Sequence, residues 1–437
     1  MAQRPARAPA APAPNHRPSG GARPKRHAPP PAATPAQQLH GKLKSRLHIF
    51  SKRAGMDLTF FILVVALVAI GLVMVFSASY ANASQRFNNP YYFVRQQALW
   101  AVIGIILMIA ISFFDYHHLH RLVPLFAIVT FVTLAITAVS AMTGGNKLVP
   151  NTNGAYRWIN LGSFQFQPSE IAKFTLVLLL AQVMSVHLFP EKKRRELNRS
   201  DKVAQRRLLF QIILIVGVIC GLVILEKHMS ATIILLLIAA VMLFVGGAPI
   251  RWFVAGGAAI GVGMVALLTS SLYQHAGGRI EGWLNPFNPP EGVDTWQTQQ
   301  SLYAIGSGRL LGLGLGNSRQ KYMYLPEPQN DFIFAIVCEE LGFIGALVII
   351  ILFGVLVWRG IMISLRAKDR FGMLLGIGLT MQVGLQVVLN IAVVTNTIPN
   401  TGISLPFFSY GGTSLVMLLA QMGIILSISR TSNIEKT

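Results

Sequence analysis

Long apolar stretches separated by short polar ones make up most of this chain. Several of them reach the roughly 20 residues that a helix needs to cross the hydrocarbon core of a bilayer. The pattern predicts an all-α, polytopic integral membrane protein with about ten transmembrane helices. The expected spans are Leu58–Tyr80, Leu99–Phe114, Leu122–Met142, Ile171–Leu188, Leu208–Leu225, Ala231–Val245, Trp252–Leu272, Phe332–Val357, Phe371–Val394 and Thr413–Ser427.

The composition supports the same class of protein. Hydrophobic residues make up 53% of the chain and charged residues only 12%. The formal net charge of +21 would indicate nucleic acid as the partner of a soluble domain. Here the basic residues gather in one terminal stretch and in alternate loops, so we expect anionic lipid and no nucleic acid. Cys220 and Cys338 lie in apolar stretches, which indicates core packing rather than a disulfide or a metal site.

The first 56 residues differ from the rest of the chain. They are rich in Pro, Ala and Arg and contain no acidic residue. We expect residues 1–56 to form a disordered, basic, cytoplasmic tail, because they cannot bury enough apolar surface to offset their ordering entropy. No apolar core follows the basic residues closely, so this is not a signal peptide pattern. The membrane domain is expected at residues 57–430 and a short cytoplasmic tail at 431–437.

The distribution of Lys and Arg predicts the orientation in the membrane. Loops on the side of the tail include the basic run Lys192–Arg195 and residues 359–370. The opposite loops hold little beyond Arg86, Arg95, Lys147 and Arg157. Because Lys and Arg favour cytoplasmic loops, we expect both termini in the cytoplasm. The loop at residues 273–331, between the seventh and eighth expected spans, then lies outside the cell.

This outer loop is a long polar segment with many glycines, carboxylates and amides. Loops of such length are usually functional or disordered, and the tryptophan, tyrosine and leucine content argues against disorder. The glycines at Gly312, Gly314 and Gly316 follow no strand pattern and have no Lys-Ser/Thr partner, so a nucleotide cradle is not expected. We expect a backbone that bends closely against a helix or a ligand.

A second polar set precedes the fourth expected span. Pro168, directly before Ser169 and Glu170, predicts a helix start. Glu170 and Lys173 then share one face of that helix. Two interpretations stay open: a structural ion pair at the membrane boundary, or a polar wall for an anionic ligand with Arg157 as a bidentate phosphate ligand.

Three carboxylates flank the start of the eighth expected span: Asp331, Glu339 and Glu340. At 1.5 Å per residue, Glu339 lies roughly 12 Å from Asp331 along the helix axis. An ionisable group at that depth costs about 2.5–3.5 kcal/mol on insertion scales, so these groups should be paired or face a wet cavity. We expect Glu340 to hold helices together, and Glu339 or Asp331 to lie opposite Lys173.

The last outer loop, residues 396–414, carries no charge and many hydroxyls and amides. Irregular backbone at membrane depth is tolerated only where it is buried in protein or lines a cavity. The loop is therefore expected to be re-entrant and to line a substrate site, with a polarity that suits sugar hydroxyls.

Several motifs can be compared as a set. They read Gly154-Ala-Tyr-Arg-Trp-Ile with Gln167-Pro-Ser-Glu-Ile-Ala-Lys173, Gln300-Ser with Ala304-Ile-Gly-Ser-Gly308, Gly316-Asn-Ser-Arg-Gln-Lys321, Pro326-Glu-Pro-Gln-Asn-Asp331 with Glu339-Glu-Leu-Gly342, and Asn396-Thr-Ile-Pro-Asn-Thr-Gly402 with Leu405-Pro-Phe-Phe-Ser-Tyr-Gly-Gly412. Together they resemble the SEDS family (shape, elongation, division and sporulation), and most of all its FtsW/SpoVE branch. The resemblance covers Asp57 to about Arg430.

The resemblance implies a peptidoglycan glycosyltransferase that polymerises lipid II at the outer face of the bacterial cytoplasmic membrane. The C4 hydroxyl of one GlcNAc attacks C1 of the MurNAc of the growing strand, inverts it and expels undecaprenyl diphosphate. A carboxylate near the hydroxyl and cations near the diphosphate would serve this reaction. The resemblance leaves open a divalent cation, Mg²⁺ or Mn²⁺, and implies no other cofactor. The implied partners are lipid II, the nascent glycan strand, a class B penicillin-binding protein and other divisome or elongasome membrane proteins.

The family's catalytic Asp lies in the outer loop, commonly in an Asp-Pro-x-x-Asp-Pro context, and this chain departs there. It reads Asn285-Pro-Phe-Asn-Pro-Pro290, so Asp294 becomes the first choice for the base and Glu291 the second. A further departure is Glu226-Lys-His-Met-Ser230, where relatives often read Glu/Gln-Pro-Asp-x-Gly/Ser. The remaining residues expected at the substrate are Arg157, Glu170, Lys173, Gln297, Gln300, Ser301, Lys321, Glu327, Asp331, Asn396, Pro399, Thr401 and Ser409.

Two other functions stay open. A lipid II flippase would use buried charges at the bilayer midplane and paired broken helices. A scaffold would recruit a transpeptidase through its helices and tail. Few charges are expected at the bilayer midplane, and the outer loop is rich in glycines, carboxylates and amides. Both features favour an enzyme over a flippase. The Leu325–Asp331 motif and the long tail favour a role in division or sporulation over elongation.

Overall fold

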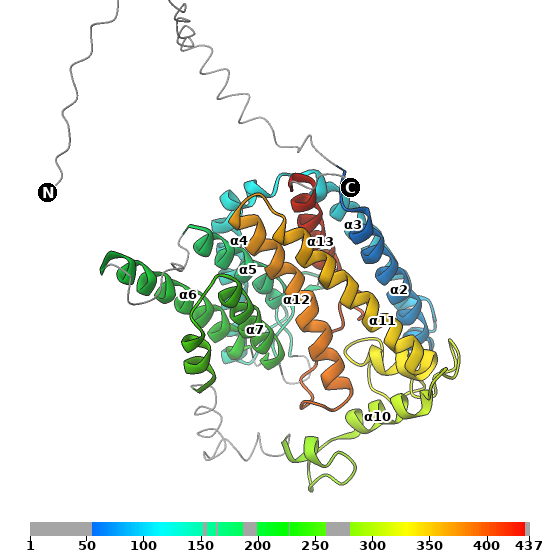
Figure 1. The fold of residues 1–437 in the computed structure, drawn as a ribbon. Coiled ribbons are helices and arrows are strands. Elements are labelled where there is room, and N and C mark those ends of the chain that lie inside the picture. Colours follow the sequence, from blue (N-terminus) through cyan, green and yellow to red (C-terminus); the bar gives the residue numbers. More distant parts are fainter. Residues whose placement is uncertain are drawn as a thin grey trace, which may run out of the picture. The chain divides into compact units, whose positions relative to one another are not determined.

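The computed structural model describes residues 55–151, 155–162, 165–186, 199–226, 228–258 and 280–432. Most of these residues are helical, as Figure 1 shows. The helices are α2 (Leu58–Phe87), α3 (Tyr92–Phe113), η1 (Tyr116–His118), α4 (Leu119–Thr143), α5 (Pro168–Val186), α6 (Arg199–Leu225), α7 (Met229–Val245), α10 (Trp296–Gly308), α11 (Ile333–Leu365), α12 (Arg370–Val394) and α13 (Gly412–Thr431). One short hairpin pairs β1 (Ile159–Asn160) antiparallel with β2 (Gln165–Phe166).

The predicted polytopic helical architecture is confirmed. Eight helices in the described part of the chain are long and apolar enough to cross a membrane, and α7 is a shorter apolar helix. Together they account for all the expected spans except Trp252–Leu272, most of which lies outside the described residues. Some helices are longer than the apolar pattern alone indicated. Helix α2 continues past Tyr80 to Phe87 because no breaker intervenes, and it ends at Asn88, which adopts a left-handed conformation.

The stretch between Leu225 and Ala231 is a break between two packed helices. Helix α6 ends at Leu225 and α7 begins at Met229, so Glu226 and His228 lie in a tight connection. The hydroxyl of Thr232 donates to the carbonyl of His228 and helps to hold the first turn of α7. The connection therefore brings a carboxylate and an imidazole to the end of a helix pair.

Helix α12 lies among several other helices. It packs against α5, α7, α11 and α13, and α13 packs along α3. Helix α10 is outside this group and lies beyond the ends of α11 and α12 (Figure 1). We call this end of the bundle the α10 end and the opposite one the Asp57 end.

Helices α2 and α11 are joined at both ends by charged groups. At the Asp57 end, the Asp57 carboxylate accepts from the amide of Phe60 and so caps α2. The same carboxylate pairs with Arg359 of α11, with Nη2 and Oδ2 2.7 Å apart. Near the α10 end, the hydroxyl of Ser77 on α2 lies 2.7 Å from both carboxylate oxygens of Glu340 on α11. The expectation that Glu340 holds helices together is confirmed.

Helix α11 is interrupted at Gly342, whose φ of 68° is the left-handed region that favours glycine. The interruption separates the carbonyls of Glu339 and Glu340 from the amides of residues 343 and 344. All four groups instead bond to one loop segment, residues 309–314, over 2.9–3.1 Å. A Cβ on Gly312 would lie 2.2 Å from the Glu340 carbonyl oxygen. The predicted close backbone approach is therefore confirmed at Gly312, where its partner is the broken helix, whereas a Cβ on Gly316 would meet nothing within 4 Å.

Candidate functional site

A set of buried and half-buried polar side chains gathers at the α10 end of the bundle. We call it the polar cluster, and its members come from the β-hairpin region, the start of α5, the α6–α7 connection and the residue two before α11. They are Arg157, Gln167, Glu170, Lys173, Glu226, His228 and Asp331. Arg157 lies close enough to Glu226, His228 and Asp331 to act electrostatically on all three. The cluster thus joins four segments that are far apart in sequence.

The start of α5 supplies the ion pair expected from the sequence. Helix α5 begins at Pro168, as predicted, and Glu170 lies in its first turn. The Lys173 ammonium donates to the Glu170 carboxylate over 2.8 Å. Lys173 is only 2% exposed, so its charge is held inside the protein. An ion pair this well buried can be structural and still leave the lysine beside a ligand, so both earlier interpretations stay open.

Glu226 is the most enclosed member of the polar cluster. Its side chain is fully buried, and one carboxyl oxygen accepts from the hydroxyl of Thr137. The other oxygen has no hydrogen-bond partner among the described residues. Burial raises the pKa of Glu226 to about 8, although the Thr137 hydrogen bond and the charge of Arg157 act in the opposite direction. Glu226 is therefore mainly protonated at neutral pH.

His228 is neutral for a related reason. Burial lowers the pKa of His228 to about 3, and the charges of Arg157 and Lys173 lower it further. Its Nδ1 lies 3.4 Å from the side-chain nitrogen of Gln167. Burial also raises the pKa of Asp331 to about 6, against the effect of Arg157. At neutral pH Glu226 and His228 are thus mainly uncharged, whereas Asp331 is mainly ionised beside Arg157, and Lys173 is paired with Glu170.

The loop between α12 and α13 covers the polar cluster. The hydroxyl of Ser230 donates to the carbonyl of Thr401 over 2.5 Å. A Cβ on Gly402 would lie 3.0 Å from a carboxylate oxygen of Asp331, so the loop backbone runs beside that carboxylate. The Thr401 hydroxyl oxygen and that of Ser169 are buried and have no hydrogen-bond partner among the described residues. Such groups are normally satisfied, so their presence here is typical of a site that binds polar ligands or water.

The same loop also reaches α10. Asn396 exchanges two hydrogen bonds of 3.0 Å with Trp283, one through each residue's side chain. The side-chain nitrogen of Asn400 donates to the side-chain oxygen of Gln297 over 3.2 Å. Pro399, in the same loop, is half-buried. One loop therefore connects the polar cluster to the segment that holds the two candidate bases.

Asp294 and Glu291 are both exposed at the start of α10. One oxygen of Asp294 accepts from the amide of Trp296 over 2.9 Å, which caps the first turn of α10. The indole of Trp296 in turn donates to the carbonyl of Tyr324 over 2.8 Å. Asp294 thus has a structural role, and its exposed carboxylate is also accessible to a substrate hydroxyl.

Several other residues expected at the substrate hold the fold together. The buried Ser301 donates to the carbonyl of Val394 and fixes α10 on α12. Ser409 donates to the carbonyl of Asn330 and accepts from the amide of Leu405, which closes its loop. Further members of this group are Gln300, which is buried, and Glu327, which pairs with Arg86 over 2.8 Å. None of these contacts brings them into the polar cluster.

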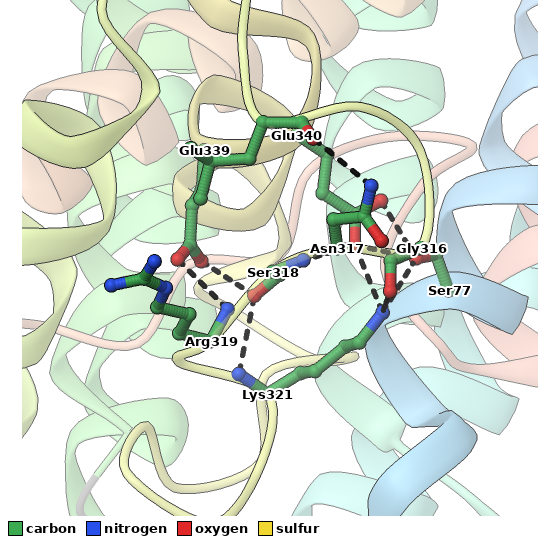
Figure 2. A network of polar contacts seen from close by, with 9 residues as sticks. Ser77, Gly316, Asn317, Ser318, Arg319, Lys321, Glu339 and Glu340 are labelled. Atoms are coloured by element: carbon green, nitrogen blue, oxygen red, sulfur yellow. Dashed lines mark hydrogen bonds and ion pairs between the residues drawn. The ribbon is translucent and has the colours of Figure 1, made fainter.

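Lys321, Glu339 and Glu340 form a separate buried network, drawn in Figure 2. The ammonium of Lys321 donates to Glu340 over 3.1 Å and to the carbonyl of Gly316 over 2.5 Å. Glu339 accepts from the hydroxyl of Ser318 and the amide of residue 319. Either Glu339 or Asp331 was expected opposite Lys173, and Glu339 is not in that place, because its carboxylate binds this loop segment. The network fixes residues 316–321 against the broken part of α11.

Sequence reasoning missed Glu226 and His228 as members of the site. The available signal was a carboxylate and an imidazole between two apolar stretches. For metals, no group of three His, Cys, Asp or Glu side chains with a suitable arrangement occurs in the described ranges of the chain.

Fold and site together define a multi-pass helical membrane protein with a buried polar site at one end of the bundle. A family model described as "Cell cycle protein", for FtsW, RodA and SpoVE, matches residues 57–434. The chain belongs to this family, which confirms the resemblance to SEDS proteins.

Individual relatives match over nearly their whole length. Stage V sporulation protein E of Bacillus subtilis is 40% identical over 383 residues, which is 87% of this chain and 99% of the relative. A probable peptidoglycan glycosyltransferase FtsW of a Geobacter species is 37% identical, with 86% and 97% covered. Among solved structures, a peptidoglycan synthase complex that coordinates polymerisation and crosslinking matches with a TM-score of 0.67 and 25% identity. RodA of Thermus thermophilus matches with a TM-score of 0.59 and the same identity. Each structural match covers 87% of this chain and 99% of the other.

Proposed function

We propose that this chain is a peptidoglycan glycosyltransferase that polymerises lipid II and works in cell division or sporulation. The names of its FtsW and SpoVE relatives support this activity and these roles. The observation that carries the proposal is the loop at residues 396–402. It connects a buried polar site that contains Arg157 and Lys173, suited to a diphosphate, with an exposed carboxylate, suited to a sugar hydroxyl.

The reaction assigns a role to each of these two places. Asp294 takes the proton from the C4 hydroxyl of the attacking GlcNAc. The hydroxyl oxygen forms a bond to C1 of the MurNAc, and the bond from C1 to the diphosphate breaks with inversion. Arg157 and Lys173 stabilise the negative charge that develops on the departing undecaprenyl diphosphate. Glu291 is the second choice for the base.

The orientation in the membrane is part of the proposal. The Lys and Arg distribution places the α10 end outside the cell and both termini in the cytoplasm. Lipid II is then used at the outer face of the cytoplasmic membrane. A divalent cation, Mg²⁺ or Mn²⁺, would bind through the oxygens of the substrate diphosphate.

A transpeptidase is the proposed protein partner. The solved complex whose chain resembles this one couples polymerisation with crosslinking. A class B penicillin-binding protein supplies crosslinking chemistry and would bind this chain within the membrane, together with other divisome or elongasome membrane proteins. The partner would align the growing strand with the crosslinking enzyme.

The direct test is polymerisation of fluorescent lipid II by the purified protein, with and without a candidate transpeptidase. We expect long glycan strands on a gel, and none with the Asp294→Asn variant. If no strands form while the protein moves lipid II across a vesicle bilayer, the flippase function replaces the proposal. A protein that does neither but binds the transpeptidase would be a scaffold.

A further inference from the structure

The loop that follows α10 carries an exposed apolar surface. Leu311 is 79% exposed, and five further large side chains of this segment are more than half exposed. We call this surface the loop patch, and it consists of Leu310, Leu311, Leu315, Tyr322, Met323 and Tyr324. An exposed apolar surface of this kind marks a membrane or protein contact in most proteins.

Two charged contacts between α2 and α11 show how the loop patch lies relative to the bilayer. Asp57 and Ser77 are separated by twenty residues of α2, which is about 30 Å of helix. On α11, Glu340 lies just before the break at Gly342, and the unbroken helix from Phe343 to Arg359 spans sixteen residues, about 24 Å. The distance along α2 equals the roughly 30 Å of a hydrocarbon core. The Asp57–Arg359 and Ser77–Glu340 contacts are thus about one core thickness apart along α2, so we take them as approximate levels of its two boundaries.

Exposed aromatic side chains support these boundaries. Trp358 is exposed beside Arg359 at the Asp57 end. Tyr80 is exposed one turn beyond Ser77 at the α10 end. Tryptophan and tyrosine are enriched where hydrocarbon meets the headgroups. The exposed aromatic residues thus lie near the same two boundaries of the hydrocarbon core as the charged contacts.

The loop patch is continuous with the lipid-facing surface of α11 at the second boundary. The amide of Phe343 donates to the carbonyl of Arg309, and that of Ile344 donates to Leu310. Phe343 and Ile344 are themselves exposed on α11, which is long and apolar enough to span the membrane. The loop patch therefore begins where the hydrocarbon surface of α11 ends.

The charge of the segment complements a lipid surface. Residues 308–325 contain three cations, Arg309, Arg319 and Lys321, and no acidic residue. Arg309 and Arg319 are exposed beside the apolar side chains. Apolar and aromatic side chains with neighbouring cations are typical of segments that lie in the headgroup layer of anionic membranes.

We infer that residues 309–324 lie in the headgroup layer of the bilayer, with the loop patch inserted among the lipids. The occupant of this surface is thus the membrane itself. Because the indole of Trp296 bonds to the carbonyl of Tyr324, the insertion holds the start of α10, and Asp294 with it, just above the membrane surface. A lipid-linked sugar would meet the carboxylate at this height.

The test measures how deeply residues of the loop patch lie in the bilayer, and it requires neither substrate nor enzymatic activity. Cys220 and Cys338 are replaced by Ala, and single cysteines are introduced as Leu311→Cys and Met323→Cys. Matched controls are Asn288→Cys, exposed in the same loop before α10, and Leu347→Cys, exposed on α11. Each spin-labelled variant is placed in nanodiscs containing phosphatidylglycerol. Collisions with oxygen, which partitions into lipid, are compared with those of a water-soluble nickel chelate.

We expect the ratio of oxygen collisions to nickel collisions to be several-fold higher for labels at 311 and 323 than for the label at 288. A high ratio of oxygen to nickel collisions at 347, as expected for a site exposed to lipid, verifies that the bundle is folded and inserted. If 311 and 323 collide with nickel as readily as 288 does, the segment lies in water and the inference is wrong. If neither reagent reaches them, protein covers the patch, either from the same chain or from a second copy, which also overturns the inference. Lipid II polymerisation is scored separately, so its failure would leave this measurement unaffected.

Discussion

The side-chain nitrogen of Asn400 donates a hydrogen bond to the side-chain oxygen of Gln297, 3.2 Å away. Asn400 precedes Thr401, whose carbonyl binds Ser230 beside the polar cluster, and Gln297 follows Trp296 at the start of α10. This contact couples the two places that the proposed reaction needs. Each of them can be tested by single substitutions.

The first prediction concerns the base. Asp294→Asn should reduce lipid II polymerisation about 10²–10⁴-fold, because the amide cannot accept the hydroxyl proton. The fold should survive, since Asn caps a helix as well as Asp does and can still accept from the Trp296 amide. Thermal unfolding and a gel assay of strands measure the two effects.

Glu291→Gln is the matched control for that substitution. It removes a neighbouring exposed carboxylate without altering the α10 cap, and we expect near-normal strand synthesis. A dead Glu291→Gln variant beside an active Asp294→Asn variant would make Glu291 the base.

The second prediction concerns phosphate recognition by Arg157. Arg157→Lys should impair polymerisation nearly as much as Arg157→Ala, because an ammonium cannot make the two parallel hydrogen bonds of a guanidinium. Binding of lipid II to the purified variants and strand synthesis would be measured together. An active Arg157→Lys variant would show that the site needs only a positive charge.

The third prediction concerns the proton on Glu226. The pKa of this carboxyl is about 8 in the folded protein and 4.5 in its ordinary state, so the native state binds the extra proton between those values. Stability should therefore fall as pH rises through this window. In Glu226→Gln the group cannot ionise, so the melting temperature of the variant relative to the native chain should increase from pH 5 to pH 8. A difference that does not change with pH would mean that Glu226 is ionised throughout.

The fourth prediction concerns the Lys321–Glu340 pair. Lys321→Ala leaves a buried carboxylate without its cation and should destabilise the protein by about 3–5 kcal/mol. The double variant Lys321→Met with Glu340→Leu removes both charges and should recover much of that loss. Thermal unfolding in detergent compares the three proteins. Equal melting temperatures for the single and double variants would argue against a charge effect.

The fifth prediction concerns orientation. A cysteine at Glu291 or Gln299 should react with a membrane-impermeant maleimide in intact spheroplasts if this loop lies outside, as the Lys and Arg distribution predicts. The native cysteines are buried and serve as the unlabelled background. Labelling that appears only after permeabilisation would place the α10 end in the cytoplasm and exclude the proposed reaction at the outer face.

The helices and the family could be predicted from the sequence. The length of an apolar stretch and the residues of a short motif can both be read without knowing how distant segments pack. The start of α5 at Pro168 and the Glu170–Lys173 pair depend on residues three apart and were predicted correctly. The partner of Glu339 could not be predicted, since it depends on how residues 316–321 fold back onto α11. Glu226 and His228 were missed for the same reason, because their neighbours come from distant segments.

The interruption of α11 at Gly342 has a consequence for assembly in the membrane. A span with this break has two carbonyls and two amides without partners in the helix, and residues 309–314 satisfy all four in the folded protein. We therefore expect the loop and the span to fold as one cooperative unit. An epitope tag inserted between Gly308 and Gly316 would disrupt a transmembrane helix, whereas one at residues 288–291 would leave the helix intact.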